Sequence, residues 1–237
     1  MSAPGSSTEL EEAFARIEAA VADGDTDLRS LGFWRLLATV KADAALSVRW
    51  ADAAGRIDRA AFEAGVRFRL PVWLGNGLLA LGTLAGALAV VLALATRSPV
   101  SAGVWLLVAA GVWSVTLHDL AHWLVGRVVG IRFIAYFVGW RPPPPRPGLK
   151  TDYASYLRAS ARGRAWMHAS GAIATKLATL APLVFVPASE APGWTVGALL
   201  GFGAFAVTTD LLFSFRLSDW KKVRRELRIA RLQASNR

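Results

Sequence analysis

Cysteine is absent from the 237 residues of this chain, and histidine occurs only three times. The lack of cysteine excludes a disulfide framework, a thiolate nucleophile and a thiolate metal ligand. Any metal ion must therefore be held by histidine and carboxylate side chains. Charged residues are also few, at 19%, whereas hydrophobic residues make up 54%. This composition, with long runs that carry no charge, is typical of an integral membrane protein.

Four apolar runs are long enough to cross the hydrocarbon core of a bilayer as helices. The first, residues 72–95, contains no charged residue. At about 1.5 Å per residue it extends about 36 Å, against about 30 Å of hydrocarbon. The others cover about 100–126, about 166–188 and 194–215. We predict an all-α, polytopic membrane protein with about four transmembrane helices.

The remaining segments flank this membrane core. Residues 1–70 carry apolar stripes at helical spacing, and residues 217–237 form a basic amphipathic pattern. The chain is thus predicted to have a cytoplasmic or interfacial helical region (1–70), a transmembrane core domain (71–216) and a cytoplasmic tail helix (217–237). The first stripe consists of Leu10, Phe14, Ile17 and Val21.

A short apolar segment follows the second run. Residues 131–140 are apolar apart from Arg132, but ten residues cannot cross the bilayer as a helix. Backbone at membrane depth must find its hydrogen bonds within the protein. We therefore expect a re-entrant strand or loop that packs against the protein.

The net charge of +10 is distributed unevenly along the chain. The connections after the first and third runs carry one charge each, at Arg97 and Glu190, whereas the other connections and the tail are rich in arginine and lysine. By the positive-inside rule both termini are cytoplasmic, and we expect a multi-pass protein of the plasma membrane. The basic segments flank spans and have no recognition motif, so they indicate the lipid bilayer and not nucleic acid as the partner.

The most informative motif is His118-Asp119-Leu120-Ala121-His122, which lies in the second run. Residues four apart on a helix share a face, so the two imidazoles can bind one Zn²⁺ ion with Asp119 beside them. Histidines near a helix end also occur at lipid headgroups or bonded to a neighbouring helix. The spacing is therefore necessary for a metal site and not sufficient.

Other polar groups in the runs lie at a similar depth. Counted from the outer ends of their helices, His118, Asp119 and His122 lie about 21 to 27 Å down, Lys176 about 20 Å and Asp210 about 24 Å. Ionisable side chains at membrane depth indicate a functional site. The alternative is a buried ion pair of Lys176 with Asp210 or Asp119 that only holds helices together. Depth favours Asp210 as the third metal ligand.

These features resemble the site-2 protease family of intramembrane zinc metalloproteases. That family has His-Glu-x-x-His on one core span and an Asn…Leu-Asp-Gly segment on a later one, whose aspartate is the third zinc ligand. The counterparts here are residues 118–122 and residues 210–219, and the resemblance covers about residues 100–220. The apolar segment 131–140 is similar to the family's re-entrant strands, against which extended substrate lies.

The resemblance implies a role for each matching residue. His118 and His122 would bind zinc, and Asp119 would replace the glutamate that acts as general base. One fewer methylene draws this carboxylate back by about 1.2 to 1.5 Å from the position of the glutamate. The third ligand stays open between Asp219, which the motif alignment favours, and Asp210, which depth favours.

Two further polar residues, His168 and Lys176, are expected beside the ligands without binding the metal. Lys176 has no counterpart in the family, and a cation near a metal ion requires a carboxylate partner. Trp220 stands where the family has the glycine after its aspartate.

The function that these patterns favour is a site-2-protease-like intramembrane zinc metallopeptidase. Its substrate would be a transmembrane or membrane-anchored polypeptide, cleaved near the cytoplasmic side. One alternative is a catalytically inactive relative that acts as a binding scaffold for membrane proteins. Another is an ion or proton pathway built from the intramembrane polar groups, which the lack of an inverted repeat disfavours.

Overall fold

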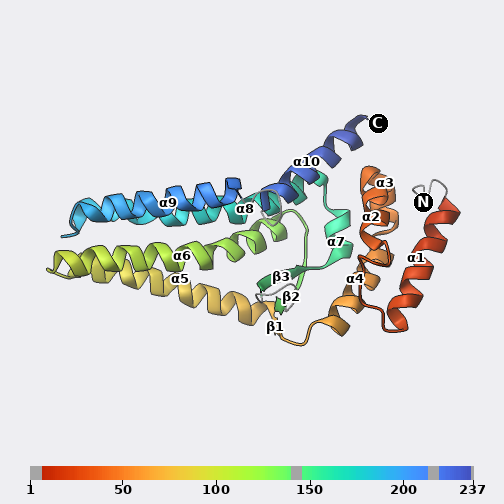
Figure 1. Cartoon of the computed structure of the whole chain (residues 1–237), viewed down its shortest axis with the longest axis horizontal. Helices are drawn as coiled ribbons and strands as arrows, with labels where there is room; N and C mark the ends of the chain where they lie inside the picture. The colour runs from red at the N-terminus through yellow and green to blue at the C-terminus, as the bar shows by residue number, and fades with distance from the viewer. Residues whose placement is uncertain (1–6, 140–145, 213–218, 236–237) are drawn as a thin grey trace. The chain divides into compact units, whose positions relative to one another are not determined.

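The computed structural model describes residues 7–139, 146–212 and 219–235. In this part of the chain the protein is mostly helical, as predicted, with one three-stranded antiparallel sheet in addition (Figure 1). The chain divides into two compact units, each assembled from separate segments. The described residues of the first unit fall within 1–72, 126–164 and 226–237, and those of the second within 73–125 and 165–225.

The first unit has a helical core of its own. Its complete helices are α1 (Ser7–Ala22), α2 (Phe33–Ala42), α3 (Ala44–Arg49), α4 (Ala51–Gly65) and α7 (Tyr153–Arg158). The predicted stripe on α1 is confirmed, because all four of its members are buried. The ring of Phe14 in this stripe stacks on Trp50 with a centroid distance of 4.8 Å.

The sheet of this unit has the order β1 (Arg69–Pro71), β2 (Phe133–Gly139) and β3 (Arg146–Thr151). In β2, Phe137 lies opposite Arg69 of β1 on one side and Gly148 of β3 on the other. The apolar segment predicted as a re-entrant strand or loop therefore contains the central strand, and residue 140 lies outside the described residues. Because both neighbours pair with β2, its backbone groups are satisfied within the protein.

A buried group of charges fixes part of helix α10 (Asp219–Ser235) in this unit. Glu226 is fully buried, with Oε1 2.5 Å from Lys41 Nζ and Oε2 2.6 Å from Arg164 Nε. The Tyr156 hydroxyl donates a 3.1 Å hydrogen bond to the same carboxylate. Burial alone would raise the pKa of Glu226, but the two cations outweigh it and lower the pKa to about 2.

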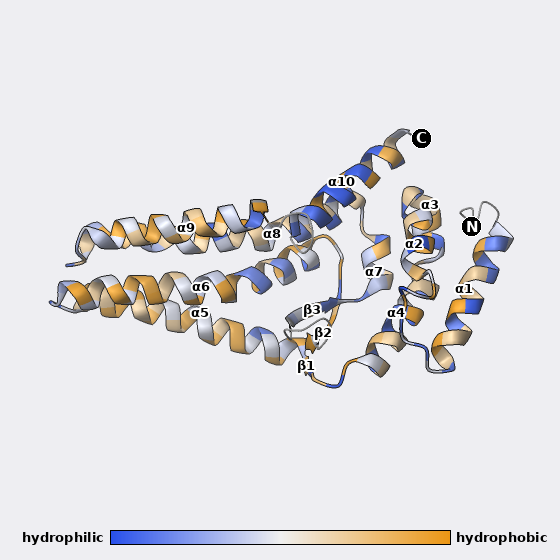
Figure 2. Cartoon of the chain, in the orientation of Figure 1, coloured by the Kyte–Doolittle hydropathy of each residue, from blue (hydrophilic) through white to orange (hydrophobic). Residues whose placement is uncertain are grey.

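The second unit is built mainly from long apolar helices (Figure 2). They are α5 (Val72–Ala95), α6 (Pro99–Val128), α8 (Ala161–Leu180), which continues as the 3-10 helix η1 (Ala181–Ala188), and α9 (Trp194–Leu212). Within the described residues, three segments are long and apolar enough to cross a membrane, namely 72–95, 99–128 and 161–188. The predicted fourth span, 194–215, runs past the end of α9 into residues outside the described ranges.

Helices α5 and α6 approach closely at two glycines of α5. A Cβ atom on Gly82 would lie 2.6 Å from Thr116 Cγ2, and one on Gly86 would overlap the Trp113 ring. Thr83, between them, accepts a 3.0 Å hydrogen bond from Trp113 Nε1 at its carbonyl and bonds to the Thr116 hydroxyl at 3.1 Å. Small residues four apart with interhelical hydrogen bonds are typical of packing between membrane helices.

Candidate metal centre

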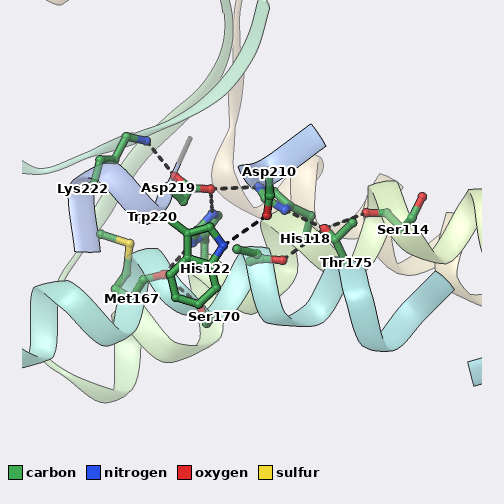
Figure 3. Close-up of polar contacts among 12 residues, drawn as sticks. Ser114, His118, His122, Met167, Ser170, Thr175, Asp210, Asp219, Trp220 and Lys222 are labelled. Atoms are coloured by element: carbon green, nitrogen blue, oxygen red, sulfur yellow. Dashed lines mark hydrogen bonds and ion pairs between the residues drawn. The ribbon is translucent and has the colours of Figure 1, made fainter. Parts of the chain in front are cut away.

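The two motif histidines lie one turn apart on α6 and point to the same side of the helix (Figure 3). Their ring centroids are 4.7 Å apart and the ring planes are nearly perpendicular, at 89°. Both His118 and His122 are partly buried. The i, i+4 spacing thus brings the two rings together, as the sequence predicted.

Asp219, the first residue of α10, completes a three-residue group with these histidines. Its Oδ2 atom lies 3.4 Å from His118 Nε2 and 3.1 Å from His122 Nε2. One ligand atom from each residue lies within 4.8 Å of the other two, so the group could hold a metal ion. Lys222 Nζ lies 2.9 Å from the other carboxylate oxygen, Oδ1.

Helix α8 holds the opposite nitrogen of each ring. His122 Nδ1 lies 2.6 Å from the Met167 carbonyl oxygen, which can only accept, so Nδ1 carries the proton. His118 Nδ1 lies 2.9 Å from the Thr175 hydroxyl. That hydroxyl has one proton and two carbonyl acceptors for it, Gly171 at 3.1 Å and Ser114 at 3.4 Å, and we therefore assign its oxygen as the acceptor of His118 Nδ1–H. Both rings then present the lone pair of Nε2.

This protonation pattern makes the centre a fitting receptor for a cation. Two Nε2 lone pairs and a carboxylate oxygen converge, and lone pairs repel unless a proton or a metal ion lies between them. In a four-coordinate zinc site with bonds of about 2.0 to 2.1 Å, neighbouring ligand atoms lie about 3.3 to 3.4 Å apart. The two Nε2···Oδ2 distances of 3.4 and 3.1 Å are close to this spacing. Outward hydrogen bonds from Nδ1 are the usual support of metal-binding histidines.

The His122 ring fits in its place because residue 171 is a glycine and has no side chain. A Cβ atom on Gly171 would lie less than 3.0 Å from three atoms of that ring, including Nε2. Gly171 is buried in the middle of α8, one turn from Met167 and one turn from Thr175. Any larger residue at this position would displace His122.

Asp119, the predicted general base, follows His118 on α6 and is partly buried. Among the described residues, no hydrogen bond or ion pair engages its carboxylate.

His168, expected beside the ligands, is buried on α8 with its ring centroid 6.5 Å from that of His122. It is not one of the three residues of the candidate metal group.

The structure brings Asp219, and not Asp210, to the histidines. Asp210 forms an ion pair with Lys176, which is the structural alternative considered from the sequence, and accepts a 3.2 Å hydrogen bond from Trp220 Nε1. The depth argument for Asp210 treated the fourth apolar run as one helix through Asp219. The described part of α9 covers Trp194–Leu212 and Asp219 is the first residue of α10, with residues 213–218 outside the described ranges, so the placement of Asp219 is taken from its contacts and not from axial rise along α9.

Sequence reasoning overlooked the contribution of α8. Met167, Gly171 and Thr175 follow one another at intervals of four and face the histidines, which are also four apart on α6. The matching intervals were the available signal. They were hard to recognise because two of the three positions contribute a backbone carbonyl or the absence of a side chain.

Comparison of the chain with protein-family models, curated proteins and solved structures finds no match.

Proposed function

We propose that this protein is a zinc-dependent intramembrane peptidase of the site-2 protease type. The observation that carries the proposal is the convergence of His118 Nε2, His122 Nε2 and Asp219 Oδ2 at helices long and apolar enough to cross a membrane. Three protein ligands leave one position of a tetrahedral zinc ion open, as catalytic zinc sites do. Structural zinc sites, by contrast, use four protein ligands.

The residues of the centre would have three separate roles, which are binding the metal ion, orienting its histidine ligands and accepting a proton. His118, His122 and Asp219 would hold the ion, with Met167 and Thr175 fixing the orientation of the two rings. Bound zinc supplies Lewis acidity and a nucleophilic water at neutral pH. Asp119 would accept a proton from that water, because it directly follows the ligand His118 on α6 and its carboxylate has no hydrogen bond or ion pair among the described residues.

The substrate that fits this location is a membrane-bound polypeptide. The histidines lie in the second half of α6, and the segments that follow α6 are basic. With α9 as a fourth span, the positive-inside rule puts this end of α6 and both termini on the cytoplasmic side of the plasma membrane. Cleavage would therefore take place near the cytoplasmic face.

Metal content tests the ligand assignment. Full-length protein in lipid nanodiscs is expected to hold about one zinc per chain, as three convergent ligands imply. The variants His118→Ala, His122→Ala and Asp219→Ala should lose it. His168→Ala is the matched control, because it removes the remaining histidine of the chain without removing a ligand. Equal, near-zero metal in wild type and all variants would overturn the proposal.

Turnover tests the catalytic assignment. With a bilayer-spanning peptide carrying a fluorophore and a quencher, Asp119→Asn should keep zinc but lose cleavage by about 10²-fold or more. Asp119→Glu restores the longer carboxylate and measures whether the site has been adapted to aspartate.

A binding scaffold is the second candidate function, and the aspartate in place of glutamate at position 119 is the observation that favours it. If wild type, Asp119→Asn and Asp119→Glu all bind zinc and none cleaves membrane-spanning peptides, the peptidase proposal fails and the scaffold replaces it.

A further inference from the structure

A second polar group lies beside the metal centre and joins three helices. Lys176 of α8 pairs with Asp210 of α9, and Asp210 Oδ2 also accepts the hydrogen bond from Trp220 Nε1 of α10. Lys176 Nζ donates in addition to the Ala172 carbonyl at 3.0 Å. The proposed chemistry uses none of these three side chains.

Trp220 directly follows Asp219 in the first turn of α10. Its indole is held by the hydrogen bond to Asp210 at one edge and packs against a small apolar cluster formed by Ala165, Ala169 and Val223. Terminal turns of helices fray, so a ligand at the first helical residue is poorly ordered unless its neighbour is fixed. The anchored indole supplies that constraint for Asp219.

The ion pair in turn determines how Asp210 is placed. An unpaired lysine or aspartate in an apolar helix is costly, so Lys176 and Asp210 each require the other. The pairing orients the Asp210 carboxylate toward Trp220. It also compensates the positive charge of Lys176, which would otherwise oppose a divalent cation at the histidines.

We propose that Lys176, Asp210 and Trp220 form a positioning chain that holds Asp219 at the two histidines. This inference rests on the proposed metal site and goes beyond it. Asp210 is then not a metal ligand. It acts through Trp220 on the ligand Asp219.

The first test removes only the indole donor. Trp220→Phe keeps an aromatic ring and deletes the hydrogen bond to Asp210, and we expect zinc affinity to fall about 10 to 100-fold, the usual effect of losing a partner that orients a metal ligand. Trp113→Phe is the matched control, because it deletes a similar 3.0 Å indole hydrogen bond between α5 and α6 away from the centre. Its zinc affinity should equal that of wild type.

The spectrum of bound Co²⁺ separates positioning from general stability. Co²⁺ in place of zinc has visible absorption that depends on the number and geometry of its ligands. Trp220→Phe should still bind Co²⁺ but with a changed spectrum, because the change disturbs the position of the ligand Asp219. Trp113→Phe should leave it unchanged, even if it lowers the unfolding temperature.

Exchange of the two charges tests whether the ion pair acts on Asp219 through Trp220 or only holds α8 and α9 together. The double variant Lys176→Asp with Asp210→Lys restores an ion pair between α8 and α9 but removes the acceptor that position 210 offers to Trp220 Nε1. Zinc affinity should therefore stay low in the exchanged protein. Recovery of wild-type affinity would mean that the pair only holds the helices together, and the proposal would be wrong.

A double-variant cycle gives an independent criterion. Asp210→Leu also removes the acceptor of Trp220, so Asp210→Leu combined with Trp220→Phe should cost no more affinity than the worse single change. If the two losses of zinc affinity add, Asp210 and Trp220 act independently and the proposed positioning chain is wrong. If wild type itself binds no zinc, the proposed function fails; if wild type binds zinc and Trp220→Phe binds it equally well, only the positioning chain fails.

Discussion

Replacing Gly171 with alanine is the most direct perturbation of the proposed metal centre that leaves each of the three candidate ligands in place. The added Cβ would lie less than 3.0 Å from three atoms of the His122 ring, whereas ordinary contact begins at 3.4 Å. The ring must therefore retreat by about 1 Å, several times the roughly 0.2 Å by which metal–ligand distances vary. It would also lose its hydrogen bond to the Met167 carbonyl.

The expected result is a zinc affinity at least about 100-fold weaker, the upper end of the effect of disturbing a ligand's support. Competition with a chromophoric chelator, on full-length protein in nanodiscs, measures the affinity. Gly203→Ala is the matched control, because its Cβ would lie 2.6 Å from Leu180 Cδ2 and crowd α8 against α9 with no metal ligand involved. Wild-type zinc binding by Gly171→Ala would refute the described placement of His122.

Two further predictions concern stability. Because the pKa of Glu226 is lowered to about 2 in the folded protein, its contribution, about 3 kcal/mol, is complete above about pH 4.5 and is lost as the pH falls toward 2. Denaturant unfolding at several pH values should show this loss in wild type and not in Glu226→Gln. Gly86→Ala pushes a Cβ into the Trp113 ring and should destabilise the protein by about 1 to 3 kcal/mol, measured by unfolding in detergent. Gly77→Ala, which meets open space, should not.

Local periodicity predicted the parts of the structure that depend on a single helix. The stripe on α1 is buried and His118 and His122 share a face of α6, because both follow from about 3.6 residues per turn. The apolar runs likewise identified the long helices. In these cases the relevant neighbours lie within a few residues of one another, and one sequence window contains them.

Features that depend on contacts between distant segments could not be predicted from the sequence. The strands that flank β2 come from residues 69–71 and 146–151, and no local pattern specifies that pairing. The sequence left the third ligand open between Asp210 and Asp219 for a similar reason, since the placement of Asp219 beside the histidines depends on contacts between distant segments. The amphipathic pattern predicted for residues 217–237 likewise does not show that Glu226 is fully buried between Lys41 and Arg164, which are distant in the sequence.

The support that α8 gives to the histidines has a consequence for how such a site evolves. The carbonyl at position 167 does not depend on the identity of the side chain, so other residues that fit the buried site of Met167 can supply it, and serine can replace the hydroxyl of Thr175. Gly171, by contrast, cannot be replaced, because any side chain there would overlap the His122 ring. Relatives of this chain that keep the same centre are therefore expected to keep the glycine opposite the second histidine, even where residues 167 and 175 differ.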